Sequence, residues 1–96
     1  MKKIVINKCH GGFGLSNLAM RRYAEIKYNS GDVNTIHVYD IRRDDPVLVQ
    51  VVEELGEKSN DVYSDLKIVE IPEDVDWYIH EYDGLEHVAE RHRTWS

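Results

Sequence analysis

Residues 3–19 read KIVINKCHGGFGLSNLA, and this stretch decides the predicted fold. Residues 4–6 are three consecutive β-branched residues, which is typical of a buried strand. Ser16 is a good helix N-cap, and apolar residues recur after it at helical spacing until Gly31, where the helix should end. The stretch therefore predicts a strand, a glycine-rich loop and a helix in direct succession.

Two further elements follow the first helix. Residues 35–41, TIHVYDI, alternate apolar and polar side chains and predict a second strand. Asp44 or Asp45 is placed to cap the next helix. Pro46 suits its first position, and Gly56 stands where it should end. We expect right-handed crossovers in both strand–helix units, which would make the first strands parallel.

The last third of the chain predicts strands. Residues 66–72, LKIVEIP, form a third strand that is closed by proline. Asp83-Gly84 lies between two strand-capable segments and signals a hairpin, because both turn positions tolerate positive φ. A stripe of apolar residues from Leu85 also fits a final helix, so residues 85–95 stay open between strand and helix, with the hairpin preferred.

These elements predict one α/β domain that spans residues 1–96. The expected order is β-α-β-α-β-β-β, a mixed sheet with two helices and a C-terminal β-hairpin. The composition agrees, because 42% of the 96 residues are hydrophobic and 31% are charged, close to globular averages. No apolar run approaches the roughly 18 residues that a membrane span needs, so we expect no membrane association.

Charge and cysteine content narrow the function classes. The formal net charge of −6 argues against nonspecific binding to nucleic acid, which needs a basic surface. An excess of acid in a small protein most often serves solubility, and the alternative is an acidic face that meets a basic partner or mimics a nucleic acid. Cys9 is the single cysteine, which rules out an internal disulfide. With no secretory leader in the sequence, we expect a cytoplasmic protein, and we predict no cofactor.

The glycine-rich loop is the first candidate site. Ligands collect beyond the carboxyl ends of parallel strands, and Gly11, Gly12 and Gly14 would let the backbone amides approach an anion there. Arg42 or Arg43, after the second predicted strand, is placed to clamp a phosphate or carboxylate. The predicted ligand-binding residues are Asn7, Lys8, His10, Gly11, Gly12, Phe13, Gly14, Ser16, Asp40, Arg42 and Arg43.

Other interpretations of this loop stay open. It lacks both the lysine of a Walker A motif and the third glycine of the dinucleotide fingerprint, so it also fits a tight strand-to-helix turn with Phe13 in the core. The arginines would then pair with Asp44, Asp45 or the acidic surface. Cys9 is a poor candidate nucleophile, because no base or orienting group is evident.

The predicted hairpin holds a second candidate site. Counting from its turn places Glu81 opposite Glu86, and this repulsive pair should be offset by an arginine, a bound cation or a raised carboxylate pKa. Arg42 and Arg93 are the candidate arginines. The residues of this possible second site are Glu81, Glu86, His87, Glu90, His92 and Arg93.

The same hairpin allows two kinds of chemistry. A glutamate pair near His92 suits general acid–base work or a hard metal ion. His80 faces His87 across the hairpin, which suits a transition metal. A solvated hairpin with scattered charges explains the same residues, and we predict no metal site.

Four segments of the chain resemble a known family. They are INKCHGGFGLS at 6–16, RRDDPVLVQVVEELG at 42–56, LKIVEIP at 66–72 and EYDGLEHVAERHRTW at 81–95. Together they resemble a widespread group of small phage- and prophage-encoded proteins. The resemblance implies a setting, the bacterial cytoplasm during infection, where small phage proteins often counter host defence by binding an effector or sequestering a nucleotide signal.

The residues and the resemblance together suggest a non-enzymatic binding module for a small anionic ligand, such as a nucleotide. The aromatic-rich hairpin offers more apolar surface than two helices cover, so we also expect a homo-oligomer. One alternative is an inhibitor whose acidic hairpin face occupies a basic surface on a host protein. Another is a small hydrolase or transferase that uses Glu81, Glu86, Glu90 and His92.

Overall fold

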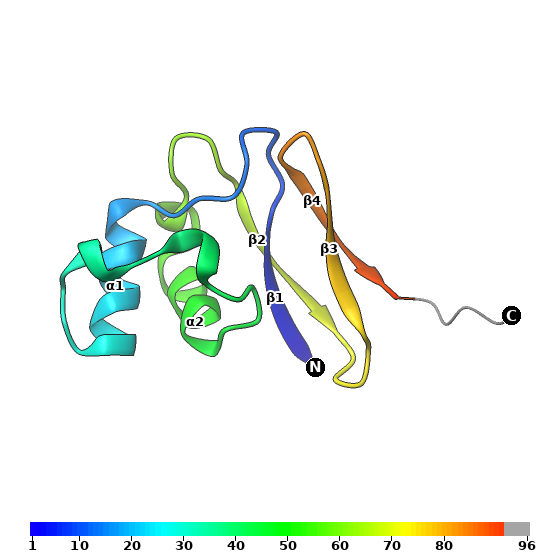
Figure 1. Ribbon diagram of the computed structural model, residues 1–96, viewed down its shortest axis with the longest axis horizontal. Coiled ribbons are helices and arrows are strands. Elements are labelled where there is room, and N and C mark those ends of the chain that lie inside the picture. The colour runs from blue at the N-terminus through cyan, green and yellow to red at the C-terminus, as the bar shows by residue number, and fades with distance from the viewer. Residues whose placement is uncertain (92–96) are drawn as a thin grey trace, which may run out of the picture.

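The computed structural model describes residues 1–91, which form a single small α/β domain of two helices and four strands (Figure 1). The strands are β1 (Lys2–Asn7), β2 (Leu66–Ile71), β3 (Trp77–Tyr82) and β4 (Leu85–Glu90), and the helices are α1 (Asn17–Tyr28) and α2 (Pro46–Leu55). Three short 3-10 turns are η1 (Val33–Thr35), η2 (Val38–Asp40) and η3 (Gly56–Ser59). No helix within residues 1–91 is long and apolar enough to cross a membrane.

Both strand pairs are antiparallel. β1 pairs with β2, with Val5 opposite Ile68, and β3 pairs with β4. Val5 and Ile68 belong to the core formed with the apolar sides of α1 and α2. The predicted α/β class with a C-terminal hairpin is confirmed. The predicted parallel crossover is wrong, because the strand that pairs with β1 is β2, which runs antiparallel to it.

Local capping signals begin both helices as predicted, but α1 ends at Tyr28 with Asn29, and not Gly31, in the left-handed cap conformation. The Ser16 hydroxyl accepts a first-turn backbone N–H at 3.1 Å and begins α1. Asp45, rather than Asp44, caps α2, and Pro46 occupies its first position. Gly56 follows the last residue of α2 with a φ of 55°, a conformation that glycine adopts without strain.

Residues 35–41 are not a strand, which corrects the prediction. They lie in η1, η2 and the irregular residues beside them. Their apolar residues are partly buried against the core: Ile36, Val38 and Ile41. The alternating pattern is thus satisfied by two tight turns. The edge of β1 that a second strand would use is also taken, because the Val5 N–H donates to the carbonyl of Arg43 at 2.8 Å.

β3 and β4 form the predicted hairpin in the register counted from the sequence, with Glu81 opposite Glu86. Asp83 and Gly84 have φ values of 53° and 89°, as a two-residue turn of this kind requires. The alternative of a final helix is therefore wrong for β4. Residues 92–96 lie outside the described part of the chain.

The β1–β2 pair lies between the helices on one side and the hairpin on the other (Figure 1). β4 contacts β1, yet no backbone ladder joins these two strands. Strand alternation directs Ile4 and Ile6 away from the helices, and both are nevertheless buried. The contacts between β4 and the carboxyl end of β1 form the candidate site.

Candidate functional site at the junction of the glycine loop and the hairpin

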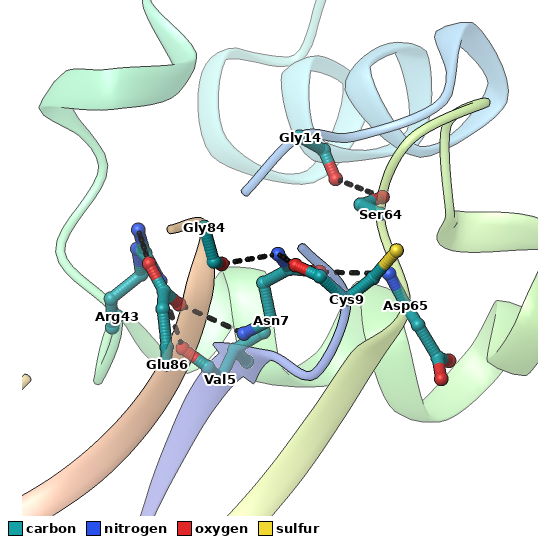
Figure 2. A network of polar contacts seen from close by, with 9 residues as sticks. All are labelled: Val5, Asn7, Cys9, Gly14, Arg43, Ser64, Asp65, Gly84 and Glu86. Atoms are coloured by element: carbon teal, nitrogen blue, oxygen red, sulfur yellow. Dashed lines mark hydrogen bonds and ion pairs between the residues drawn. The ribbon is translucent and has the colours of Figure 1, made fainter. Parts of the chain in front are cut away.

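Glu86 is the centre of a buried polar network (Figure 2). Its side chain is 5% exposed, and Arg43 binds both carboxylate oxygens, with Nη1 2.5 Å from Oε1 and Nη2 2.9 Å from Oε2. The backbone N–H of Asn7 donates to Oε1 at 2.8 Å. Both carboxylate oxygens therefore accept hydrogen bonds from the chain itself: two from the bidentate guanidinium and one from a backbone N–H.

Asn7 ties three segments of backbone together. Its side-chain amide donates to the carbonyls of Cys9 and Gly84, at 2.6 and 2.8 Å. Its side-chain oxygen accepts the N–H of Asp65 at 2.8 Å. The side chain is fully buried at the end of β1. The glycine loop, the start of β2 and the hairpin turn therefore meet at this one side chain (Figure 2).

Arg43 hydrogen-bonds to the edge of β1 that is not paired with β2. Its carbonyl accepts the Val5 N–H at 2.8 Å, and its guanidinium donates to the Val5 carbonyl at 3.5 Å. The same guanidinium lies over the ring of Phe13, 3.6 Å from the ring centroid. Phe13 is buried in the core, where the attraction between a cation and a ring face is stronger than in water.

The glycines of the loop serve close contacts within the chain. A Cβ atom at Gly11 would collide with Tyr63, and a Cβ atom at Gly14 would collide with the carboxylate of Asp61. The hydroxyl of Ser64 donates to the Gly14 carbonyl at 2.9 Å. Loop 60–65 therefore occupies the space that these glycines open, which a ligand would need.

The hairpin turn is pressed onto the same loop. A Cβ atom at Gly84 would collide with the backbone of His10 and Gly12. Gly12 itself has a φ of 97°, a left-handed conformation that favours glycine. The glycine loop and the hairpin turn therefore pack against each other, backbone to backbone.

The predicted ligand-binding residues are brought together only in part. Asn7, Phe13 and Arg43 meet, but each is engaged by the chain itself. The Ser16 hydroxyl caps α1 and donates to the carbonyl of Lys58 at 2.7 Å. The structure agrees with the alternative interpretation, a tight strand-to-helix turn with Phe13 in the core.

Asp40 and Arg42 lie at a separate cavity. It measures about 670 Å³, is open to solvent, and is lined by the second half of α1, the segment 36–42 and the start of α2. Tyr28 and His37 also line it. The Arg42 side chain is 77% exposed and pairs with Asp44 at 3.0 Å. The two predicted arginines therefore belong to different sites.

The Asp45 carboxylate, in the wall of this cavity, accepts several hydrogen bonds. It accepts hydrogen bonds from the Tyr23 hydroxyl at 2.6 Å and from Lys27 Nζ at 3.2 Å. Burial raises the pKa of Asp45, but these bonds and the backbone N–H of Val47 hold that pKa below its usual range. Burial, followed by the bond to Asp45, raises the pKa of Tyr23 well above its usual range. Since Lys27 and Arg42 are both paired with carboxylates of the chain, the cavity is not a ready clamp for an anion.

The hairpin carboxylates of the second candidate site are separated by burial. Glu81 and Glu90 are exposed, whereas Glu86 is buried. The predicted repulsion between Glu81 and Glu86 is offset by an arginine, but the arginine is Arg43 and not Arg42. Among the described residues, Glu86 points into the junction while Glu81 and Glu90 are exposed, so these three carboxylates do not share one acid–base centre.

The histidines of the hairpin are exposed. His80 lies opposite His87, and Lys8 Nζ lies 3.4 Å from His87 Nδ1. Within residues 1–91, no group of three or more histidine, cysteine, aspartate or glutamate side chains is arranged to hold a metal ion. Two predicted residues lie outside the described part of the chain: His92 and Arg93.

Sequence reasoning missed the contribution of loop 60–65. Tyr63 and Asp61 fill the space beside the glycines, and Asp65 completes the contacts of Asn7. A usable signal was Asn7 itself, a polar residue that directly follows a buried strand and must find hydrogen-bond partners when buried.

Comparison with known proteins finds no matching family model, no similar curated protein and no similar solved structure.

Proposed function

We propose that this protein is a non-catalytic protein-binding module whose hairpin docks on a basic partner. One observation carries the proposal: the hairpin is anchored at its turn, while its strands keep aromatic and acidic side chains exposed. Tyr82 is 72% exposed and Tyr78 is 38% exposed. Tyrosines of this kind are enriched where proteins bind one another.

Charge defines the partner. Residues 73–91 carry seven carboxylates and one arginine, and Glu86 is the carboxylate that Arg43 neutralises. Glu81, Asp83 and Glu90 are all exposed. An acidic surface with aromatic side chains favours a basic protein surface through steering and complementarity, and disfavours nucleic acid.

The junction fixes how this surface is presented. Asn7 and Glu86 hold the hairpin to β1, so the exposed side chains are carried on a preorganised scaffold. Preorganisation reduces the entropy that is lost on binding. Combined with the resemblance to small phage proteins, this supports a host protein of the bacterial cytoplasm as the partner.

Charge reversal on the hairpin tests the proposal. Wild-type protein, E81K/E90K and the control E57K/E70K are immobilised, and proteins retained from bacterial cytosol are quantified by mass spectrometry. Dissociation constants of the retained proteins follow by calorimetry at two salt concentrations. Glu57 and Glu70 are exposed residues of η3 and β2, outside the two hairpin strands.

We expect basic proteins that bind the wild type and the control alike, and that bind E81K/E90K at least tenfold more weakly. Affinity should fall as salt rises. Equal binding by both double variants would contradict the proposal.

A further inference from the structure

We propose that the outer edge of β3 takes up an extended, basic segment of the partner as an added antiparallel strand. This inference rests on the proposed function and names the way in which the hairpin would bind. It follows from the backbone register of the hairpin, from the regularity of β3 and from the charges around it.

The register decides which backbone groups face outward. In a hairpin with a two-residue turn, Tyr82 and Leu85 form the closing hydrogen-bonded pair, and bonded pairs then recur at every second residue. At the open end of the hairpin, the Arg91 N–H donates to the Asp76 carbonyl at 2.8 Å. This bond confirms that the hydrogen-bonded pairs use the even-numbered residues from 76 to 82. The amides and carbonyls of Trp77, Ile79 and Glu81 therefore point away from β4. Among residues 1–91, no backbone partner of these outward groups is found.

The strand itself is suited to pairing. β3 spans six residues, contains no proline, and pairs residue for residue with β4 without a bulge. Natural edge strands are usually blunted by lysines, prolines or bulges, because an unprotected edge is a template for another strand. β3 lacks all three devices, and strand addition to such an edge is a recurring mode of peptide recognition.

The side chains along this edge specify the added strand. One face presents Trp77 and Ile79, both partly buried, and favours apolar residues beside them. The other face presents Tyr78 and Tyr82, which favour cations over their rings. Arg91 already lies over the Tyr78 ring, 5.4 Å from its centroid. The segment that fits alternates apolar and basic residues.

Charge excludes a second copy of this chain as the favoured occupant. Pairing two β3 edges would bring together two segments of the same sign of charge, because residues 73–91 of each copy carry seven carboxylates and one arginine. Surfaces of like charge repel one another. A basic segment instead lowers the charge of the hairpin as it binds.

The test uses an end-blocked peptide of seven residues, with arginine at odd and valine at even positions. When its valines lie beside Trp77, Ile79 and Glu81, the valine amides face β3 and the arginine amides face solvent. N-methylation of the three valines then removes the donors to β3, and N-methylation of three arginines is the matched control. Both modified peptides keep the charge of the parent.

Binding is measured by fluorescence anisotropy, together with hydrogen exchange of the protein amides. We expect valine methylation to weaken binding at least tenfold and arginine methylation to change it less than threefold. The parent peptide should protect the amides of Trp77, Ile79 and Glu81 selectively.

Proline variants test the same edge from the protein side. I79P removes one N–H that faces away from β4 and leaves the hydrogen bonds between β3 and β4 in place. E70P is the control: it removes an N–H that faces away from β1 and leaves the hydrogen bonds between β1 and β2 in place, because the N–H groups of even-numbered β2 residues face away from β1. We expect I79P to abolish peptide binding and E70P to retain it. The methylated peptides decide the question without any change to the protein if I79P does not fold.

Three results would overturn strand addition. Equal binding of all three peptides, lost in E81K/E90K, would leave charge-driven docking as the function without an added strand. Absence of binding by the parent peptide would also overturn it, while the cytosol experiment decides the proposed function separately. A dimer that I79P abolishes, seen by sedimentation equilibrium, would assign the edge to a second copy.

Discussion

Arg43 and Glu86 form a bidentate ion pair that joins two parts of the molecule between which no backbone ladder runs. The Arg43 side chain is 19% exposed, and the Glu86 side chain is 5% exposed. Arg43 also covers the edge of β1 and the ring of Phe13. The pair therefore connects the core, the first strand and the hairpin.

Replacing Arg43 by methionine should be strongly destabilising, because it leaves the buried Glu86 carboxylate uncompensated. We expect R43M to lose about 3–5 kcal/mol of unfolding free energy, measured by urea denaturation. R42M is the matched control, and its exposed pair with Asp44 should be worth about 1 kcal/mol or less. Adding E86Q to R43M should recover part of the loss, because it removes the buried charge. Equal effects of R43M and R42M would show that the pair does not hold the hairpin.

Asn7 should tolerate no change that removes its amide donors. N7D keeps the shape but loses the bonds to the carbonyls of Cys9 and Gly84, and we expect a loss of about 2–4 kcal/mol in urea denaturation. N60D is the control, because Asn60 uses only its side-chain oxygen to accept the Leu66 N–H, which aspartate also does. A loss in N60D as large as in N7D would contradict the role assigned to Asn7.

Local signals in the sequence predicted much of the fold. The cap at Asp45, proline at the first position of α2 and Asp83-Gly84 at the turn act within a few residues, so their outcome depends little on the rest of the chain. The alternation in residues 35–41 predicts a strand wrongly, because alternation reports only which side chains are buried. Two tight turns bury the same side chains.

The candidate site depended on contacts that no local pattern contains. The sequence predicted that the Glu81–Glu86 pair needs an arginine, yet only the fold shows that Arg43 supplies it. The glycine loop predicts a place for a ligand because glycines permit close approach. Close approach does occur, but the group that approaches Gly11 is Tyr63.

Alanine at Gly84 should separate packing from backbone strain. Gly84 has a φ of 89°, and an added Cβ would meet the backbone of His10 and Gly12. Gly56 has a φ of 55° and a ψ of −127° with open space around it, so G56A reports backbone strain alone, at about 1–3 kcal/mol. We expect G84A to cost about 2 kcal/mol more than G56A and to weaken hydrogen-exchange protection in β3 and β4 selectively. Equal losses in the two variants would mean that the hairpin turn does not bear on the glycine loop.

The pH dependence of stability should follow Asp45. Because its pKa is held below the usual value, the stabilising contribution is present above about pH 4 and is lost as the pH falls through the folded-state pKa. D45N keeps an N-cap oxygen for α2 but has no titrating group, so its urea midpoint should fall less steeply than that of the wild type between about pH 5 and 2.5.

The pH dependence of the Y23F urea midpoint should be intermediate between those of D45N and the wild type. This substitution removes the hydrogen bond from the Tyr23 hydroxyl to Asp45 and leaves Lys27 beside the carboxylate. D45N and Y23F leave every other carboxylate of the chain in place, so the differences between the three curves report on this site. Parallel curves for D45N and the wild type would show that Asp45 titrates alike in the folded and unfolded chain.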